Sequence, residues 1–306
     1  MSSAQVVAVT GSSGRLGTAI VQRLAQDGVP VRALDVVEGI SPPGVDFWPV
    51  DVQDERSLAV ALDGVDVLVH VAGLHGAHLV AGMPRQAFWK VNVDGTWRVL
   101  RQAVRCRTRR VVFASSTSVY GPGSKSGEAR VLDESTSFAP DDVYDITKIL
   151  GERMLLHLRE RYDVETVALR LGRFFYGNRS DYHLRKLSTG LDLYDAATAF
   201  SACVHASSFP RAAYCVASDS GLSTTQRKRL GTDLPGVVAE VLPELPAKLA
   251  FFGYPTPARF GKSSSTAALR ADLGWAPVRD LLWWCQHLDD QIQAERTEET
   301  RRGAAA

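Results

Sequence analysis

Val6-Val7-Ala8-Val9-Thr10, followed directly by Gly11-Ser12-Ser13-Gly14-Arg15-Leu16-Gly17, is the stretch that decides the fold. Its first five residues predict a buried β-strand, and the residues after Gly14 have the pattern of a helix. The three glycines between them permit a tight turn, close approach of the backbone to a pyrophosphate, and close packing of the helix on the strand. Ordinary turns also use glycine, but this order of strand, glycines and helix favours a nucleotide. The contacts to it are expected from Gly11, Ser13, Gly14, Arg15, Leu16 and Gly17.

Outward from this stretch, strand-like apolar runs alternate with amphipathic stretches of helical length as far as about residue 175. The predicted strands are Val6–Thr10, Val31–Asp35, Asp46–Val50, Val65–Val71, Arg110–Ser115 and Thr166–Leu171. The predicted helices lie near Gly14–Asp27, Glu55–Leu62, Phe88–Arg105 and Tyr144–Tyr162. Such alternation predicts an α/β protein with a Rossmann-type, doubly wound parallel sheet.

The alternation weakens after about Gly177. Helices are predicted near Tyr194–Val204, Pro235–Val241 and Ser265–Leu273, separated by loops rich in Ser, Pro and Gly. We therefore expect residues 1–175 to form the nucleotide-binding domain with the catalytic residues. Residues 176–288 are expected to form a smaller substrate-binding lobe, interleaved with the sheet. Residues 289–306 are charged and predict a tail with a frayed end.

The composition excludes several classes of protein. The chain is 306 residues long, 45% hydrophobic and 23% charged, which excludes a disordered or fibrous protein. A net charge of +1 does not indicate binding to nucleic acid or to an anionic membrane. The four cysteines lie far apart, the N-terminus lacks the pattern of a signal peptide, and no apolar run approaches the roughly 20 residues of a membrane helix. These features predict a cytoplasmic protein. No metal site is expected, since His75 and His78 lack a third ligand.

Asp35 ends the second predicted strand, close to the roughly 20-residue spacing at which an acidic residue holds the adenosine ribose hydroxyls. A carboxylate there repels a 2′-phosphate, and no arginine follows at Val36 or Val37. The position therefore favours NAD over NADP. The alternative is a solvated aspartate at the end of a strand.

Tyr144 and Lys148 lie four residues apart on one predicted helix and so share one of its faces. A free tyrosine titrates near pH 10, and a nearby ammonium is expected to lower the pKa of the phenol toward that of a general base. Such a pair also occurs by chance on many surface helices. Ser116 strengthens the hypothesis because it leaves the carboxyl end of the fifth predicted strand, where ligands of open α/β sheets bind.

Six motifs in order resemble the extended short-chain dehydrogenase/reductase family, which contains the NAD-dependent epimerases and dehydratases. They are Gly11-x-x-Gly14-x-x-Gly17, Asp51-Val52, His70-Val71-Ala72-Gly73, Asn92-Val93-Asp94-Gly95-Thr96, the Ser116 strand end and Tyr144-x-x-x-Lys148, with Leu273-Gly274-Trp275-Ala276-Pro277 near the C-terminus. The resemblance implies that Asp51 and Val52 flank the adenine and that Ala72 and Gly73 line the cofactor site. It also implies that Ser116 polarises the substrate oxygen, Tyr144 transfers the proton and Lys148 holds the nicotinamide ribose. Asn92 would lie behind the site and support a proton path.

Departures from the family narrow the expected chemistry. Ser118-Val119 stands where sugar-nucleotide dehydratases carry an Asp-Glu pair, which disfavours dehydration. The connection from Gly177 to Asp192 is short, which disfavours a nucleotide-sugar substrate. Arg185-Lys186-Leu187-Ser188-Thr189 is similar to a segment of the uronate and sugar dehydrogenase branch, whose arginine binds a substrate carboxylate. The expected substrate contacts are His75, Thr117, Ser118, Arg173 and Arg185. The alternative is that one or both arginines pair with nearby acids such as Asp181 or Asp192 and do not touch the ligand.

The sequence thus predicts an NAD-dependent oxidoreductase acting on a secondary alcohol or carbonyl of a small polar substrate, a sugar or sugar acid. An epimerase with tightly bound NAD and a non-catalytic NAD-sensing protein remain alternatives. A homodimer is also predicted, because Ile149 and Leu156 add a second apolar stripe to the helix after Tyr144. The second lobe could instead cover that stripe.

Overall fold

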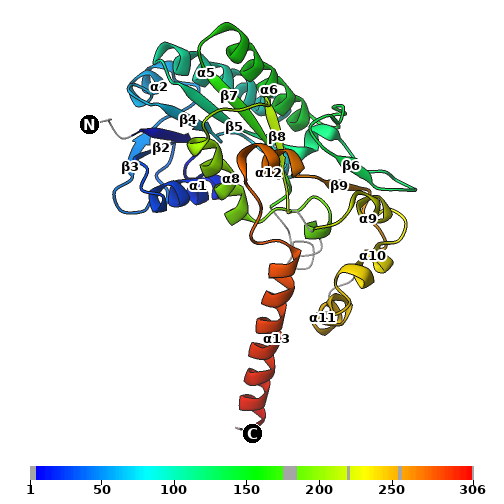
Figure 1. Ribbon diagram of the computed structural model, residues 1–306. Coiled ribbons are helices and arrows are strands. Elements are labelled where there is room, and N and C mark those ends of the chain that lie inside the picture. Colours follow the sequence, from blue (N-terminus) through cyan, green and yellow to red (C-terminus); the bar gives the residue numbers. More distant parts are fainter. Residues whose placement is uncertain (1–4, 175–184, 219–220, 254–256, 305–306) are drawn as a thin grey trace.

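A computed structural model describes residues 5–174, 185–218, 221–253 and 257–304. Residues 175–184 lie outside this range, and with them half of the short connection from Gly177 to Asp192. Seven parallel strands form one sheet in the order β3-β2-β1-β4-β5-β7-β8 (Figure 1). They are β1 (Val7–Thr10), β2 (Val31–Asp35), β3 (Asp46–Pro49), β4 (Val67–His70), β5 (Arg110–Ser116), β7 (Glu165–Leu171) and β8 (Ala213–Val216). All six predicted strands are present within two residues at each end, and the predicted doubly wound parallel sheet is confirmed.

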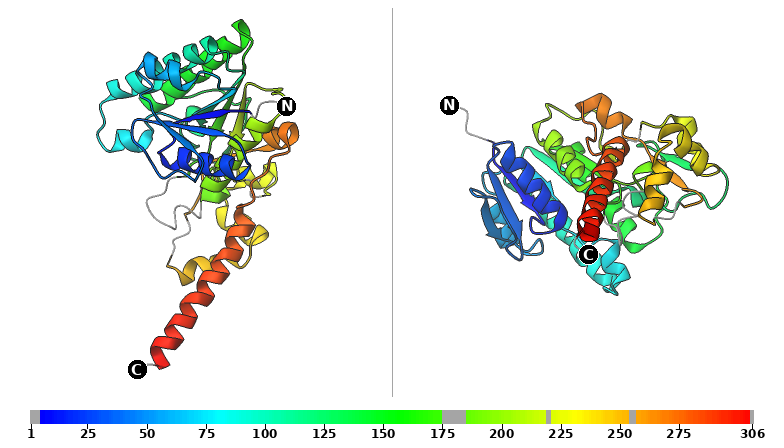
Figure 2. Two further views of the ribbon diagram at one scale, coloured as in Figure 1. Left: turned by 90° about the vertical axis from the view of Figure 1, so that its left-hand side faces the viewer. Right: turned by 90° about the horizontal axis from the view of Figure 1, so that it is seen from below.

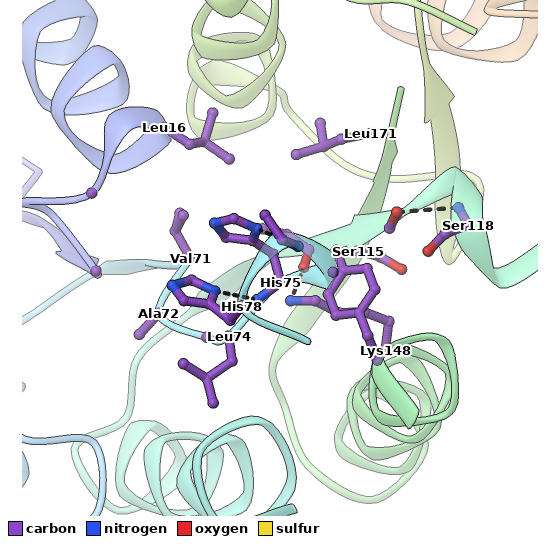
Figure 3. Close-up of a pocket in the computed structure, with 18 of the residues that line it drawn as sticks. Leu16, Val71, Ala72, Leu74, His75, His78, Ser115, Ser118, Lys148 and Leu171 are labelled. Carbon is purple, nitrogen blue, oxygen red and sulfur yellow. Dashed lines mark hydrogen bonds between the residues drawn. The ribbon is translucent and has the colours of Figure 1, made fainter. Parts of the chain in front are cut away.

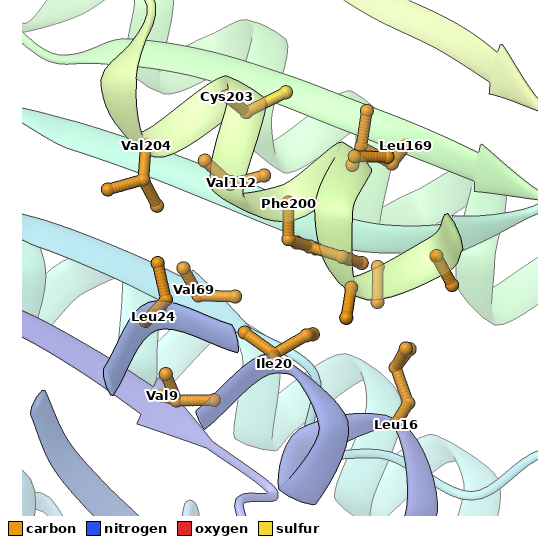
Figure 4. Packing of buried hydrophobic residues seen from close by; sticks show 14 of the residues in the cluster. Val9, Leu16, Ile20, Leu24, Val69, Val112, Leu169, Phe200, Cys203 and Val204 are labelled. Atoms are coloured by element: carbon orange, nitrogen blue, oxygen red, sulfur yellow. The ribbon is translucent and has the colours of Figure 1, made fainter. Parts of the chain in front are cut away.

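Helices cover both faces of the sheet. On one face lie α1 (Arg15–Gln26), α8 (Leu193–His205) and α12 (Ala267–Leu273). On the other lie α2 (Glu55–Ala61), α5 (Thr96–Arg105) and α6 (Val143–Arg161). Ile20 and Leu24 of α1 meet Phe200 and Cys203 of α8 above the strands, and these side chains are fully buried (Figure 4). Burial of such side chains on both faces fixes the sheet between two helical layers.

The predicted helix Phe88–Arg105 is three elements in the structure. It divides into α4 (Arg85–Phe88), a π-helical segment η1 (Trp89–Gly95) and α5. Hydrophobic periodicity does not distinguish a π-helical turn from an α-helical one, and such turns often occur at functional sites. Here the turn carries Asn92.

The smaller lobe follows β8. Its helices are α9 (Thr224–Arg229), α10 (Leu234–Val241) and α11 (Leu245–Phe251), and apolar side chains of α10 and α11 share one cluster with Trp284 and Leu288. A second parallel sheet pairs β6 (Arg130–Leu132) with β9 (Lys262–Ser264). β6, β8 and β9 were not predicted. β6 and β9 have three residues each, which is too short to show a period.

The segment predicted as a tail continues a helix. α13 (Leu281–Ala304) is anchored through Trp284, Cys285 and Leu288, and its remainder extends away from the molecule (Figures 1 and 2). The remaining short elements are α3 (Gly76–Val80), η2 (Thr117–Tyr120) and η3 (Arg185–Leu187). No helix in the described part of the chain has both the length and the apolar composition needed to cross a bilayer.

Candidate active site

A cavity of about 1290 Å³ opens at the carboxyl ends of β1, β4 and β5. The strand order reverses between β1 and β4, and ligands of open α/β sheets bind at such a point. Every predicted cofactor and substrate contact lines this cavity: Gly11, Ser13, Gly14, Arg15, Leu16, Gly17, Asp35, Asp51, Val52, Ala72, Gly73, His75, Ser116, Thr117, Ser118, Tyr144, Lys148, Arg173 and Arg185. Figure 3 shows several of them around the space between α1 and α6. Asn92 is not among the lining residues.

The backbone conformation and the space beside it differ among the three glycines. Gly11 has a φ of +71°, and a Cβ there would lie 2.7 Å from the Ala72 Cα. A Cβ on Gly17 would overlap the Gly11 carbonyl, so the helix packs directly on the turn. A Cβ on Gly14 would make only an ordinary contact, 3.4 Å from the Gly11 carbonyl oxygen, so no clash within the chain requires glycine there. Gly14 is also the N-cap of α1 and supplies no capping side chain. The turn therefore fits the pyrophosphate of a dinucleotide, which binds where helical N–H groups lack partners.

Asp35 is fixed at the end of β2 beside this turn. Its Oδ2 accepts a hydrogen bond of 3.0 Å from the Ser13 N–H, and its Oδ1 accepts one of 2.7 Å from the Val36 N–H. The carboxylate is thus held at the cavity wall, where ribose hydroxyls are bound in sheets of this kind.

Ser115 and Ser116 divide their roles at the end of β5. The Ser115 hydroxyl donates to Glu152, which forms a buried ion pair with Arg170 at 2.7 Å. The Ser116 hydroxyl instead accepts the Ser118 N–H at 3.1 Å and hydrogen-bonds the Tyr144 side chain. Successive residues of a strand face opposite ways, so only Ser116 reaches the tyrosine.

Tyr144 and Lys148 lie close together in the first turns of α6, after the N-cap Asp142. The Lys148 Nζ lies 5.8 Å from the centre of the Tyr144 ring and donates a hydrogen bond of 2.8 Å to the Ala114 carbonyl. Burial lowers the pKa of Lys148 to about 8, against the opposing effect of Glu152. The amine is therefore close to half protonated at slightly alkaline pH.

The pKa of Tyr144 is raised to about 12, so the expected lowering by Lys148 is wrong for the protein chain alone. Burial is the largest cause, the Ser116 hydrogen bond opposes it, and the carboxylates of Asp145 and Asp142 add to it. Lys148 itself is desolvated and directed at a backbone carbonyl, which accounts for its failure to stabilise the phenolate.

Asn92 is buried and is not among the residues that line the cavity. Its Oδ1 accepts the Leu74 N–H at 2.7 Å, and its Nδ2 donates to the Leu74 carbonyl at 2.9 Å and to the Thr147 hydroxyl at 3.0 Å. Thr147 in turn donates to the Tyr144 carbonyl at 2.8 Å. The π-helical turn therefore connects the loop after β4 to the helix that carries Tyr144.

His70, which was predicted only as part of a motif, connects neighbouring elements of the fold. It is fully buried, and its ring nitrogens contact the Thr10 hydroxyl at 2.7 Å and the Thr96 hydroxyl at 3.0 Å. Thr10 also accepts the N–H groups of Val71 and Ala72. This network connects the ends of β1 and β4 to the start of α5 under the cavity.

His75 and His78 cap the short helix α3. The His75 Nδ1 accepts the Ala77 N–H at 3.3 Å, and the His78 Nδ1 accepts the His75 N–H at 3.0 Å. Burial, with smaller effects of His78 and Lys148, lowers the pKa of His75 to about 4. His75 therefore presents a neutral ring to the cavity at neutral pH.

Arg173 and Arg185 approach each other although 175–184 separate them in the chain. The Arg173 backbone forms a bridge with Gly190, whose N–H donates to the Arg185 carbonyl at 2.7 Å. The alternative partner considered for Arg185, Asp192, pairs with Lys186 at 3.7 Å and with Arg279 at 3.3 Å. The other, Asp181, lies outside the described residues. Both arginines line one end of the cavity.

Four further charged residues that line the cavity were not predicted: Asp141, Asp142, Asp145 and Lys262. Asp145 directly follows Tyr144, and Lys262 begins β9. Asp145 could have been considered from its position beside the tyrosine. Nothing near Lys262 in the sequence marks it, because β9 reaches the cavity only through tertiary packing.

Comparison with known proteins agrees with this geometry. The model of the NAD dependent epimerase/dehydratase family matches residues 7–191, which is more than half of the chain. The chain is 29% identical over 175 residues to L-arabinose 1-dehydrogenase (NAD(P)(+)) of Haloferax volcanii, covering 54% of this chain and 66% of that protein. It is 32% identical over 187 residues to a 3 beta-hydroxysteroid dehydrogenase/Delta 5→4-isomerase of Mycobacterium tuberculosis, covering 59% and 50%.

A uronate dehydrogenase of Pseudomonas syringae is 28% identical over 170 residues, covering 55% of this chain and 58% of that protein. The matches thus span about half to two thirds of the length of these relatives. A short-chain dehydrogenase/reductase superfamily protein from Agrobacterium tumefaciens, solved with bound NAD, has the same fold, with a TM-score of 0.71 and 20% identity over 97% of this chain and all of that one. With the glycine turn, Ser116, Tyr144 and Lys148 in one cavity, the chain belongs to the NAD dependent epimerase/dehydratase family.

Proposed function

We propose that the protein is an NAD-dependent oxidoreductase that interconverts a secondary alcohol and a carbonyl on a small polar substrate. The observation that carries this proposal is the convergence of Ser116, Tyr144 and Lys148 with the glycine turn in one cavity. A protein that only senses NAD has no need of all three side chains. Fold alone does not support the assignment, since Rossmann-type sheets host many functions.

In the proposed reaction, bound NAD supplies the acceptor for the hydride that leaves the substrate carbon. Ser116 holds the substrate oxygen by a hydrogen bond, and Tyr144 takes the hydroxyl proton as the carbon–oxygen double bond forms. Lys148 holds the nicotinamide ribose. Asn92 lies outside the cavity lining and supports the reacting groups from behind, through Leu74 and Thr147.

Cofactor contacts are assigned to the glycine turn, Asp35, Asp51, Val52, Ala72 and Gly73. The anchored Asp35 carboxylate supports a preference for NAD over NADP, because it repels a 2′-phosphate. His75, Thr117, Ser118, Arg173 and Arg185 are proposed to contact the substrate.

A sugar acid is the proposed substrate, ahead of a neutral sugar. Arg185 and Arg173 both line the cavity and both act on the pKa of Lys262, and a guanidinium binds a carboxylate through two charge-assisted hydrogen bonds. Relatives named for arabinose and for uronates support a small sugar or sugar acid.

We also propose a cytoplasmic homodimer. The four cysteines are free, as expected in a reducing compartment. The second apolar stripe on α6 is not sufficient evidence for a dimer, because Ile149 packs against Val119, Tyr120 and Leu132 of the same chain. The exposed Trp97 of α5, which lies beside His157 of α6, supports a dimer instead.

A panel of sugars, sugar acids and secondary alcohols tests the function, read as NADH or NADPH formation with NAD and NADP in parallel. Steady NADH formation on a sugar or sugar acid is the expected result. Conversion of a sugar to its epimer with no net NADH would instead establish the epimerase alternative. Bound NAD without turnover of any compound would favour the sensor.

A further inference from the structure

Lys262 reaches the substrate end of the cavity from a part of the chain that the family match does not cover. It begins β9, beyond the helices α9, α10 and α11. It lines the same cavity as Arg173 and Arg185. The smaller lobe therefore contributes a charged side chain to the wall of the site.

The position of β9 is fixed from three sides. It pairs with β6 in parallel register, Lys262 opposite Arg130. The Ser264 N–H donates to the Ser188 carbonyl at 3.0 Å, and Ser188 follows the turn η3 that carries Arg185. Arg227 of α9 is buried and donates to Ser263 at 3.1 Å and to the Ser264 carbonyl at 2.9 Å. Lys262 and Arg185 are consequently held in one rigid arrangement.

The Lys262 ammonium is only partly satisfied by the described residues. Its Nζ donates to the Gly121 carbonyl at 2.8 Å, and an ammonium has three such donors. Three arginines and one carboxylate act on this ammonium. Burial is the largest cause of the lowered pKa of Lys262, the Asp145 carboxylate opposes the lowering, and Arg130, Arg185 and Arg173 add to it. An anion placed here would reduce the repulsion between Lys262 and the three arginines.

We propose that Lys262 is a substrate-binding residue that, with Arg185, selects substrates carrying an anionic oxygen group. This inference rests on the proposed function and deepens it, because it names the residue through which the smaller lobe determines specificity. A carboxylate or a phosphate monoester has the required chemistry, since both accept charge-assisted hydrogen bonds from an ammonium and a guanidinium. A neutral sugar offers only hydroxyls to the same groups.

Binding to the protein–NADH complex, measured by isothermal titration calorimetry, tests the proposal without requiring turnover. The probes are D-glucuronate, D-glucose 6-phosphate and D-glucose. In the wild type, one of the two anions should bind at least about tenfold tighter than glucose, as expected for one charged hydrogen bond. The stronger of the two identifies the carboxylate or the phosphate monoester as the group that is bound.

Three variants sharpen the test. Lys262→Gln should remove most of the preference for the anion, about tenfold. Lys262→Arg keeps the charge and should retain at least part of the preference. Lys228→Gln, an exposed lysine of α9 in the same lobe, is the matched control and should behave as the wild type. Unchanged NADH affinity shows that each variant is folded.

A wild type that does not distinguish anions from glucose would overturn the proposal, whether or not the variants fold. So would a Lys262→Gln variant that keeps the full preference. If the anion preference depends on Lys262 but no compound reduces NAD, the binding site stands and the proposed oxidoreductase function fails.

Discussion

Tyr144 is the residue on which the proposed chemistry depends. Its pKa of about 12 means that the phenol must be deprotonated before it can act as a base. Burial and the neighbouring carboxylates of Asp142 and Asp145 hold the phenol neutral in the chain alone. A general base must lose this proton before it can accept another. The positive charge needed to favour the phenolate is therefore not supplied by Lys148 as it lies in the structure.

Replacing Tyr144 by Phe should lower kcat by roughly 100-fold or more, the usual scale of general acid–base catalysis. The affinity for NADH should stay close to the wild-type value, because the ring is kept. Tyr162→Phe, at the exposed end of the same helix, is the control. Steady-state kinetics and NADH titration measure both quantities. Near-normal turnover by Tyr144→Phe would remove Tyr144 from the mechanism.

Asp35 should confer a preference for NAD over NADP of at least about tenfold, or about 1.4 kcal/mol. Asp35→Ala should reduce this preference for NAD over NADP. Asp35→Asn keeps an acceptor for the Ser13 N–H while it removes the charge, and so separates repulsion from anchoring of the turn. If Asn preserves the full NAD preference, repulsion of the 2′-phosphate is not the cause. The ratio of the two kcat/KM values provides the measurement.

At the scale of elements, the Thr10–His70–Thr96 network joins β1, β4 and α5 beneath the cavity. Burial, with a smaller effect of Lys148, lowers the pKa of His70 to about 3. In the unfolded chain a histidine titrates near 6.5. The native state therefore holds this ring neutral over a range in which the unfolded state binds a proton.

The stabilisation from a neutral His70 is fully present above about pH 6.5 and is lost as the pH falls toward 3. This group alone should reduce the free energy of unfolding by up to about 1.4 kcal/mol per pH unit below pH 6. His70→Gln should be less stable at pH 7 but lose less on acidification. Urea unfolding at pH 7 and pH 5 measures this, with His157→Gln on the exposed face of α6 as the control. An equal acid sensitivity of His70→Gln and wild type would contradict the assignment.

At the scale of the whole molecule, α5 and α6 present aromatic side chains on their outer face. Trp97 is 37% exposed, and its ring lies 6.3 Å from that of His157, which lies 6.2 Å from that of Tyr162. Ile146 on α6 is 39% exposed. Exposed apolar surface of this kind is typical of a protein–protein interface, and a second copy of the chain is the proposed occupant.

Trp97→Glu should therefore convert a dimer into a monomer, since a buried, unpaired carboxylate opposes association. Val278→Glu, an exposed apolar residue outside α5 and α6, should leave the dimer intact. Light scattering after size-exclusion chromatography at micromolar concentration distinguishes the two masses. A monomeric wild type would count against the dimer, and a dimeric Trp97→Glu variant would place the interface elsewhere.

What the amino-acid sequence determined is what depends on neighbouring residues. The buried strands from Val7 to Leu171, the turn at Gly11 and the shared face of Tyr144 and Lys148 all follow from local periodicity and backbone freedom. Motifs at the carboxyl ends of parallel strands meet in one cavity because the topology brings those ends together. Hence many of the residues that line the cavity could be named before the structure was known.

Other features of the site depend on the tertiary structure alone. Lys262 reaches the site because β9 pairs with β6, whose Arg130 is far away in the chain, and no local pattern encodes that pairing. The π-helical turn at Asn92 is likewise fixed by its contacts with Leu74 and Thr147. The pKa of Tyr144 is raised and not lowered as expected, because burial has the largest effect on the phenol and Lys148 is not among the groups that shift it. Local sequence determines which side chains an element presents, and packing between elements determines the environment in which they act.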